Sequence, residues 1–200
     1  MKILNLYAGI GGNRKLWGNE HDITAVELSP EIAKIYKELY PNDNVIIGDA
    51  HEFLLNNYKE FNFIWASPPC QTHSKMRACG VWSNKVAALY PDMKLWQEII
   101  FLQNFAKCNW VVENVIPFYS PLITPSFTLG RHYFWSNKFL LNSDYFPASK
   151  HHSKIDALSE RKGVDLSKYR LNNKRQILRN AVEPEIGLLI FNLINKDENK

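Results

Sequence analysis

The chain has 200 residues and a mass of 23.3 kDa, with 46% hydrophobic residues, 22% charged residues and a net charge of +4. These values suit one soluble globular domain with a single core. No apolar run approaches the roughly 18 residues of a membrane span, and the early stretch ILNLYAGIGG is too interrupted for a signal peptide. The three cysteines, Cys70, Cys79 and Cys108, match neither a disulfide framework nor a zinc motif. We therefore expect a cytoplasmic protein with no metal and no membrane contact.

Short apolar runs alternate with helical patterns over the first 115 residues. The runs predict strands over 2–7, 23–28, 44–48, 61–66 and 109–114, and the patterns between them predict helices over 12–19, 30–40, 51–58 and 92–107. Ser29 before Pro30, and Asp92 after Pro91, mark helix starts. Repeated βα units predict an α/β fold, with a mostly parallel sheet, helices on both faces and ligands beyond the carboxyl ends of the strands.

The second half of the chain is less regular. We expect one more strand over 132–139 and a helix over 181–194. From about 140 to 175 the chain is polar, and residues 150–175 hold eight Lys or Arg against three acidic residues. Such a segment is either a solvated loop or a surface that meets a phosphate backbone. We thus expect one domain in three parts: a core over 1–136, a short basic insert over 137–175, and a returning helical segment over 176–200.

The loop LNLYAGIGGNR follows the first predicted strand. Its glycines, Gly9, Gly11 and Gly12, permit a tight turn and close approach of a ligand. Their spacing fits neither the dinucleotide-binding motif nor a P-loop, so a ligand with a nucleoside and no phosphate cradle is indicated. Glu27, at the end of the second strand, could accept ribose hydroxyls, and Asp49, after the third, could bind an adenine amino group.

The stretch FIWASPPCQTHS ends the fourth strand in two prolines and a thiol. Pro68 and Pro69 predict a stiff, extended loop that presents Cys70. Taken alone, Cys70 could equally be an inert, buried loop cysteine. Glu113, in VVENV, ends the fifth strand, and a parallel sheet would bring both residues to one rim. A nucleophile beside an acid then predicts a reactive pocket.

At this point the motifs resemble those of the DNA cytosine-5 methyltransferases. LYAGIGG, ASPPCQTHS, VVENV and RQILRNAVEPEI occur in the family's order over nearly the whole chain. GRHYFWSNKF is similar to the family's aromatic motif, and PDMKLW loosely resembles its Asp-containing motif. The resemblance implies a Rossmann-like methyltransferase fold and the cofactor S-adenosylmethionine. The cofactor-binding residues that it implies are Tyr7, Gly9, Gly11, Gly12, Glu27, Leu28, Asp49, Ala50, Pro69 and Asn180.

The resemblance also implies the catalytic groups. Cys70 would add to C6 of a cytosine flipped out of duplex DNA, Glu113 would protonate N3, and the methyl group would pass to C5. Either Arg131 or His132 would contact the base. The substrate contacts would come from Gln71, Ser74 and Asn114. Two alternatives remain: the same chemistry on RNA or a free cytosine nucleotide, and a catalytically silent relative that binds DNA or a partner.

Two departures from the family pattern bear on specificity. Arg179 stands where the family usually has glycine, before Asn180. The region between the aromatic motif and Arg175 is shorter than the family's usual target-recognition region, and His151-His152 falls within it as a phosphate or solvent contact. We expect a reduced region that recognises roughly two to four base pairs. A partner subunit or self-association would supply further readout, and the phosphate contacts would come from Lys162, Lys168 and Arg170.

Overall fold

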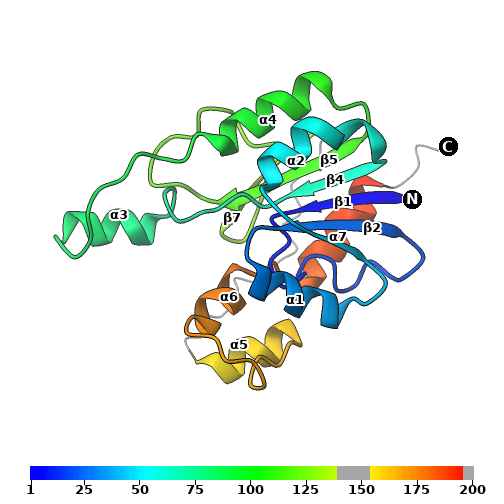
Figure 1. The fold of residues 1–200 in the computed structure, drawn as a ribbon. Helices are drawn as coiled ribbons and strands as arrows, with labels where there is room; N and C mark the ends of the chain where they lie inside the picture. Colours follow the sequence, from blue (N-terminus) through cyan, green and yellow to red (C-terminus); the bar gives the residue numbers. More distant parts are fainter. Residues whose placement is uncertain (139–153, 196–200) are drawn as a thin grey trace.

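A seven-stranded sheet lies at the centre of the structure, a computed structural model that describes residues 1–138 and 154–195 (Figure 1). The strand order is β3-β2-β1-β4-β5-β7-β6. The first five strands run parallel, whereas β7 is antiparallel to both β5 and β6. The strands are β1 Lys2–Leu6, β2 Asp22–Glu27, β3 Asn44–Ile47, β4 Phe63–Ala66, β5 Asn109–Val115, β6 Phe127–Leu129 and β7 His132–Ser136. The predicted α/β fold with a mostly parallel, Rossmann-like sheet is confirmed.

The chain order of the strands reverses beside β1. Strands β1 to β3 proceed toward one edge, and β4 then pairs with the other side of β1. In open parallel sheets such a reversal leaves a crevice at the carboxyl ends of the strands, where ligands bind. The fold therefore places a binding site beyond the ends of β1 and β4.

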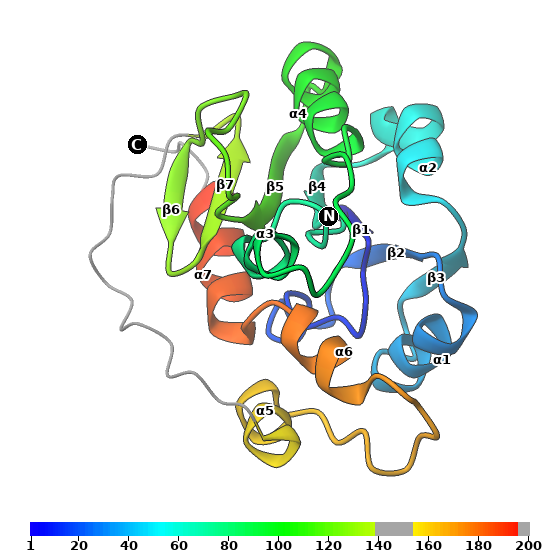
Figure 2. The ribbon, with the colours of Figure 1, turned by 90° about the vertical axis from the view of Figure 1, so that its left-hand side faces the viewer.

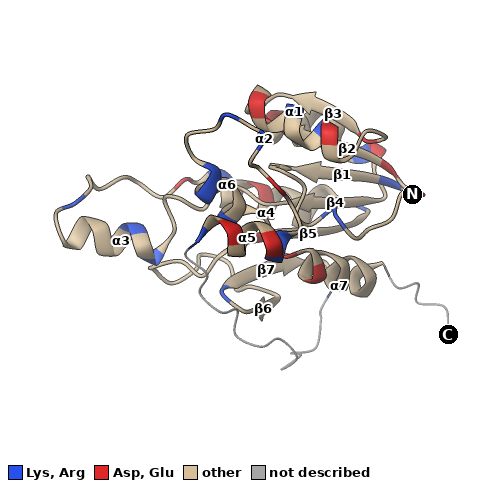
Figure 3. Ribbon diagram, turned by 90° about the horizontal axis from the view of Figure 1, so that it is seen from below, with Lys and Arg blue, Asp and Glu red and all other residues tan. Residues whose placement is uncertain are grey.

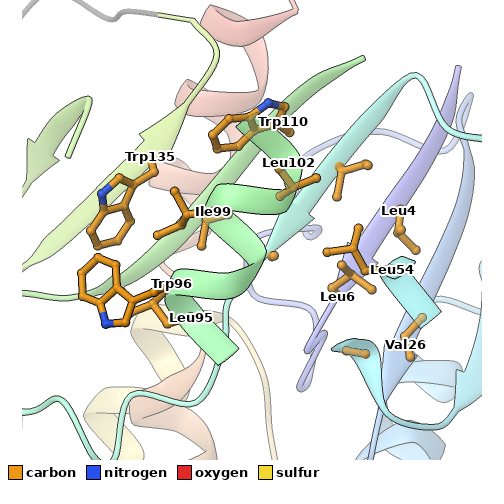
Figure 4. Packing of buried hydrophobic residues seen from close by; sticks show 14 residues of the cluster. Leu4, Leu6, Val26, Leu54, Leu95, Trp96, Ile99, Leu102, Trp110 and Trp135 are labelled. Atoms are coloured by element: carbon orange, nitrogen blue, oxygen red, sulfur yellow. The ribbon is translucent and has the colours of Figure 1, made fainter. Parts of the chain in front are cut away.

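Two helices cover one face of the sheet, α2 (Ala50–Asn57) and α4 (Lys94–Phe105). Because side chains alternate along a strand, Leu4 and Leu6 of β1 both point to this face. The buried side of α4 packs beside them, with Trp96 edge-on to Trp135 at a ring distance of 5.5 Å (Figure 4). This layer is the larger part of the apolar core.

The opposite face is covered by α1 (Pro30–Leu39) and α7 (Pro184–Ile194). Ser29 caps α1 as predicted, because its side chain accepts a hydrogen bond from the Ile32 N–H. Phe191 of α7 packs against Trp17 and Phe63, at ring distances of 5.2 and 5.5 Å. No helix within the described ranges is long and apolar enough to cross a membrane.

The helix predicted over 12–19 is wrong. This segment is a series of turns in which Gly18 has a φ of +86°. It packs directly on α7: the Trp17 Nε1–H donates to the Gly187 carbonyl over 3.1 Å, and a Cβ on Gly187 would lie 2.3 Å from the Asn13 oxygen. Side-chain contacts with α7 and with the sheet replace helical hydrogen bonds here.

Five of the described elements were not predicted: the short 3₁₀ helix η1 (Tyr58–Glu60), α3 (Lys75–Trp82), β6, α5 (Ile155–Lys162) and α6 (Lys174–Asn180). Helix α3 projects from the body of the molecule (Figure 1), and Met76 and Trp82 on it are 60% and 72% exposed. A helix that buries little shows no apolar period, which explains why the sequence pattern does not reveal it.

The described part of the basic segment, residues 154–175, packs on the core to a greater extent than its polar composition suggests. Helices α5 and α6 and the loop between them lie together beside α1 (Figure 2) and add an apolar cluster to the core. This cluster joins Leu158, Val164, Leu166, Ile177 and Leu178 to Ile10 and Ile35. The segment is therefore partly a packed extension of the core, although its polar composition suggested otherwise. His151 and His152 lie outside the described residues.

Candidate active site

A cavity of about 570 Å³ opens at the carboxyl ends of β1, β2, β4 and β5, where the strand order predicts a ligand site. The loops that follow these strands line it, together with the start of α4 and the end of α6. Most residues implied by the sequence motifs face this space. They are Tyr7, Gly9, Gly12, Glu27, Leu28, Asp49, Ala50, Pro69, Cys70, Gln71, Glu113, Asn114, His132 and Asn180.

The glycine loop forms one wall of the cavity. Gly11 has a φ of +71°, and a Cβ there would lie 2.4 Å from the Tyr40 ring. Gly12 approaches the segment after α6, since its Cβ would lie 2.3 Å from the Val182 carbonyl oxygen. Gly9 has no atom within 4 Å of such a Cβ. The loop is thus packed from behind at Gly11 and Gly12 and open at Gly9.

A buried ion pair supports the glycine loop from behind. Arg14 and Asp43 are each 2% exposed, and the Arg14 Nε–H and Nη2–H donate to the two Asp43 oxygens over 2.8 and 3.0 Å. The Tyr36 hydroxyl donates to the same carboxylate over 2.8 Å, and the Tyr40 hydroxyl donates to the Gly11 carbonyl over 2.8 Å. Sequence reasoning missed this network, because a charged residue in a loop gives no sign that it will be buried.

Glu27 binds the backbone of two loops that border the cavity. Its two oxygens accept the N–H groups of Gly9 and Ser29, each over 2.9 Å. Each carboxylate oxygen has further acceptor capacity, so Glu27 can also receive ligand hydroxyls. Its predicted role in binding ribose agrees with this position and stays a prediction.

Asp49 has a structural role in addition to the predicted contact with adenine. It caps α2 by accepting the His51 N–H over 2.8 Å, and its other oxygen lies 2.9 Å from the Lys94 ammonium. The hydrogen bond from Lys94 lowers the pKa of Asp49, so the carboxylate stays ionised. One oxygen of Asp49 is therefore already shared with Lys94.

A second polar group beside the cavity was not predicted. Glu98 of α4 is 1% exposed and hydrogen-bonds the Tyr7 hydroxyl and, over 2.9 Å, His51 Nδ1. Burial raises the pKa of Glu98, while the hydrogen bond to Glu98 raises the pKa of His51. Tyr7 has a φ of +55°, which is unusual for a residue with a side chain, and its hydroxyl contact holds it there. Only the packing of α4 on the β1 loop reveals this group.

The loop after β4 presents Cys70 to the other end of the cavity. Asn114, 1% exposed, fixes this loop because its Nδ2–H donates to the Pro68 carbonyl over 2.9 Å. The Cys70 carbonyl accepts the N–H groups of His73 and Ser74, each over 3.1 Å, which turns the chain into α3. The half-buried thiol therefore stands on a loop that is hydrogen-bonded on both sides.

Glu113 and His132 line the cavity together with Cys70. This is expected from adjacent strand ends, and Glu113 Oε1 is 3.5 Å from His132 Nε2. Arg131 is exposed in the β6–β7 turn and does not line the cavity. Of the two residues that the motif offered, His132 is thus the one beside Glu113.

The surroundings of Cys70 act on the pKa of its thiol in both directions, and the net effect raises it. Burial raises the pKa of Cys70 above its usual value, and the negative charge of Glu113 raises it further. Arg179, at the end of α6, lowers the pKa of Cys70. A buried thiol beside a carboxylate is mostly protonated at neutral pH.

Several predicted site residues lie elsewhere. Ser74 caps α3 by accepting the Arg77 N–H, and Gly11 faces Tyr40. Lys162 corrects the sequence prediction: it is 2% exposed, donates to the Ala181 carbonyl and lies 2.7 Å from Glu183 Oε1, so it is not available to a DNA phosphate. Lys168 and Arg170 are exposed, and Lys168 is 3.2 Å from Glu38.

With the geometry established, the chain was compared with known proteins. A family model described as C-5 cytosine-specific DNA methylase matches residues 1–116. The search of curated proteins gives no match. The family match confirms the expected cofactor, S-adenosylmethionine.

Similar solved structures include a mutant of DNMT2 from Spodoptera frugiperda and a SAM-dependent methyltransferase from Agrobacterium tumefaciens. The first is 24% identical, with a TM-score of 0.39, over 57% of this chain and 35% of that chain. The second is 14% identical, with a TM-score of 0.44, over 60% of this chain and 40% of that chain. This chain thus covers two fifths or less of the length of either protein. The family model matches more than half of the residues of this chain, and the chain therefore belongs to the C-5 cytosine-specific DNA methylase family.

Proposed function

We propose that this protein transfers a methyl group from S-adenosylmethionine to C5 of cytosine in DNA, through a covalent bond between Cys70 and C6. One observation supports this most directly: Cys70 and Glu113 line the same cavity as the glycine loop and Glu27. A single space of about 570 Å³ therefore adjoins both the expected cofactor residues and the expected reactive pair.

The charge of the cavity suits the cofactor. Five carboxylates line it against two side chains that are always cationic at neutral pH, and one of these, Lys94, is paired with Asp49. The carboxylates are Glu27, Glu31, Asp49, Asp92 and Glu113. When bound, S-adenosylmethionine supplies an activated methyl group on a positively charged sulfur. An excess of negative charge favours such a ligand, and Glu27 would hold its ribose hydroxyls.

The reactive pair accounts for activation of the base. The Cys70 thiolate forms a bond to C6 while Glu113 donates a proton to N3, so negative charge does not accumulate on the ring. C5 thereby becomes electron-rich enough to accept the methyl group. The C5 proton is then lost to solvent, the electron pair restores the C5–C6 double bond, Cys70 leaves as thiolate, and N3 returns its proton to Glu113. His132, beside Glu113, would orient the carboxyl group toward N3.

We propose duplex DNA with a flipped cytosine as the substrate. Arg170 is exposed, and the exposed Lys168 could exchange its contact with Glu38 for a phosphate. Helix α3 carries the cations Lys75 and Arg77 and no acidic residue (Figure 3). We keep the proposal of a reduced recognition region within residues 137–175, which contacts few base pairs. A partner subunit or self-association would then extend the readout.

The experiment measures methyl transfer from labelled S-adenosylmethionine to duplex DNA, transfer RNA and deoxycytidine monophosphate. We expect label in DNA, in 5-methylcytosine, and none with Cys70→Ala, which should still bind the cofactor. A duplex with 5-fluorocytosine should trap the wild-type protein as an adduct, because fluorine cannot leave as a proton does. Transfer to RNA or the nucleotide alone would replace the DNA proposal, and full activity of Cys70→Ala would refute the covalent mechanism.

A further inference from the structure

Arg179 is the one cation of the cavity without an ion-pair partner among the described residues. It lies on the exposed side of α6 and lines the same space as Cys70, Glu113 and His132. The cavity's other permanently charged cation, Lys94, is bound to Asp49 at 2.9 Å. The Arg179 guanidinium lines an acidic cavity and forms no ion pair with a described carboxylate, so it can interact with another anion in the cavity.

The position of Arg179 is fixed by its neighbours. Ile177 and Leu178, which precede it, are buried in the cluster that joins α6 to α1. The Ala181 carbonyl, which follows, receives a hydrogen bond from the buried Lys162. Because the backbone is anchored on both sides, Arg179 lines the cavity from a rigid support and not from a free loop.

The charges around Cys70 show what this guanidinium can do there. From β5, Glu113 opposes a second negative charge on the thiol, and burial opposes it as well. From β7, His132 is directed to Glu113, and Asp92 and Lys94, just before and at the start of α4, also line the cavity. Arg179 acts in the opposite direction to Glu113 and burial, since it lowers the pKa of Cys70.

We propose that Arg179 assists formation of the Cys70 thiolate and thereby lets a nucleophile work beside the carboxyl group of Glu113. This inference rests on the proposed function for its purpose, but it concerns the thiol itself. Arg179 would act through Cys70 as an electrostatic partner.

The test measures the rate at which iodoacetamide alkylates Cys70 as a function of pH, resolved by peptide mass spectrometry. Cys108 serves as the internal control, because burial raises its pKa and no charged side chain contributes. The variants are Arg179→Gln, which removes the charge, and Arg179→Lys, which keeps it. Arg175→Gln is the matched control, on the same helix and outside the cavity lining.

We expect Arg179→Gln to slow alkylation of Cys70 at pH 7.5 by roughly two- to fivefold, the scale of one partly screened charge, and to shift the profile to higher pH. Arg179→Lys should restore most of the rate, and 1 M salt should reduce the difference between wild type and Arg179→Gln. Cys108 should not change in any variant, nor Cys70 in Arg175→Gln.

An unchanged Cys70 profile in Arg179→Gln would overturn the inference, and so would an equal change at Cys108, which would indicate a general structural effect. Since alkylation needs no cofactor and no nucleic acid, the result is separate from the proposed function. A protein that shows the shift but transfers no methyl group would refute the function and keep the role of Arg179.

Discussion

Replacement of Asn114 by alanine tests whether the hydrogen bond to the Pro68 carbonyl holds Cys70 in place. Asn114 is 1% exposed; its Nδ2–H donates to Pro68 over 2.9 Å, and its Oδ1 accepts the Val115 N–H over 3.0 Å. Asn114→Ala leaves two backbone groups without these partners. An unpaired buried polar group costs about 1–3 kcal/mol, so we expect a loss of about 2–4 kcal/mol, since the Val115 group is only part-buried.

The effect on activity should be larger than stability alone explains. A shift of about 1 Å in a reacting group can cost about 100-fold in rate, so we expect roughly this loss in kcat for methyl transfer, with little change in cofactor affinity. Urea denaturation and single-turnover kinetics below the unfolding transition measure the two effects.

The matched control is Asn104→Ala. Asn104 lies exposed on α4, where its Nδ2–H donates to the Ile100 carbonyl over 2.7 Å, and the change should cost less than about 0.5 kcal/mol with no effect on kcat. If Asn114→Ala unfolds more easily as expected but transfers methyl groups at the wild-type rate, the hydrogen bond stabilises the fold without positioning Cys70.

Four further changes test the cofactor loop and the basic surface. Glu27→Gln should weaken S-adenosylmethionine binding by about 1–3 kcal/mol in calorimetry, because charge-assisted hydrogen bonds are removed, and unchanged affinity would place the ribose elsewhere. Asp43→Ala should lower the free energy of unfolding by about 3–5 kcal/mol in urea, because it leaves a buried guanidinium uncompensated. Glu38→Ala, at an exposed pair that solvent screens, should lower the free energy of unfolding far less than Asp43→Ala, and equal effects of the two changes would contradict this reasoning. Replacing Lys168 and Arg170 by Gln together should weaken DNA binding equally across sequences and reduce its log–log salt slope by roughly one for each phosphate that is no longer neutralised; an unchanged slope would show that neither side chain binds a phosphate.

Much of the central sheet was predictable because its strands are short apolar runs with clear boundaries. Helices that bury one whole side, such as α4, were predictable because such burial places apolar residues at the helical period in the sequence. The turns over 12–19 were not, because their conformation depends on α7, which lies far away in sequence. Helix α3 was missed because it buries almost nothing.

The candidate site was predictable where a residue type and a strand end coincide, as at Cys70 and Glu113. It was not predictable where a side chain is recruited by packing, as with Glu98, which contacts Tyr7 only because α4 crosses the β1 loop. Lys162 shows the reverse error. Its charge suggested a surface contact. In the structure, the ion pair with Glu183 and the hydrogen bond to the Ala181 carbonyl offset the free-energy cost of burying the ammonium group.

The contact between the glycine loop and the segment after α6 has a consequence for how the protein forms. Gly12 packs against Val182, and the Trp17 indole N–H donates a hydrogen bond to the Gly187 carbonyl. The wall of the cavity therefore depends on contacts between residues some 170 positions apart in the sequence. Such distant contacts form late in folding, because a long loop must close before they are made. During synthesis from the N-terminus, the sheet strands are available long before residues 182–187 leave the ribosome. The nascent chain should therefore acquire affinity for the cofactor only after residues 182–187 have left the ribosome and packed on the glycine loop.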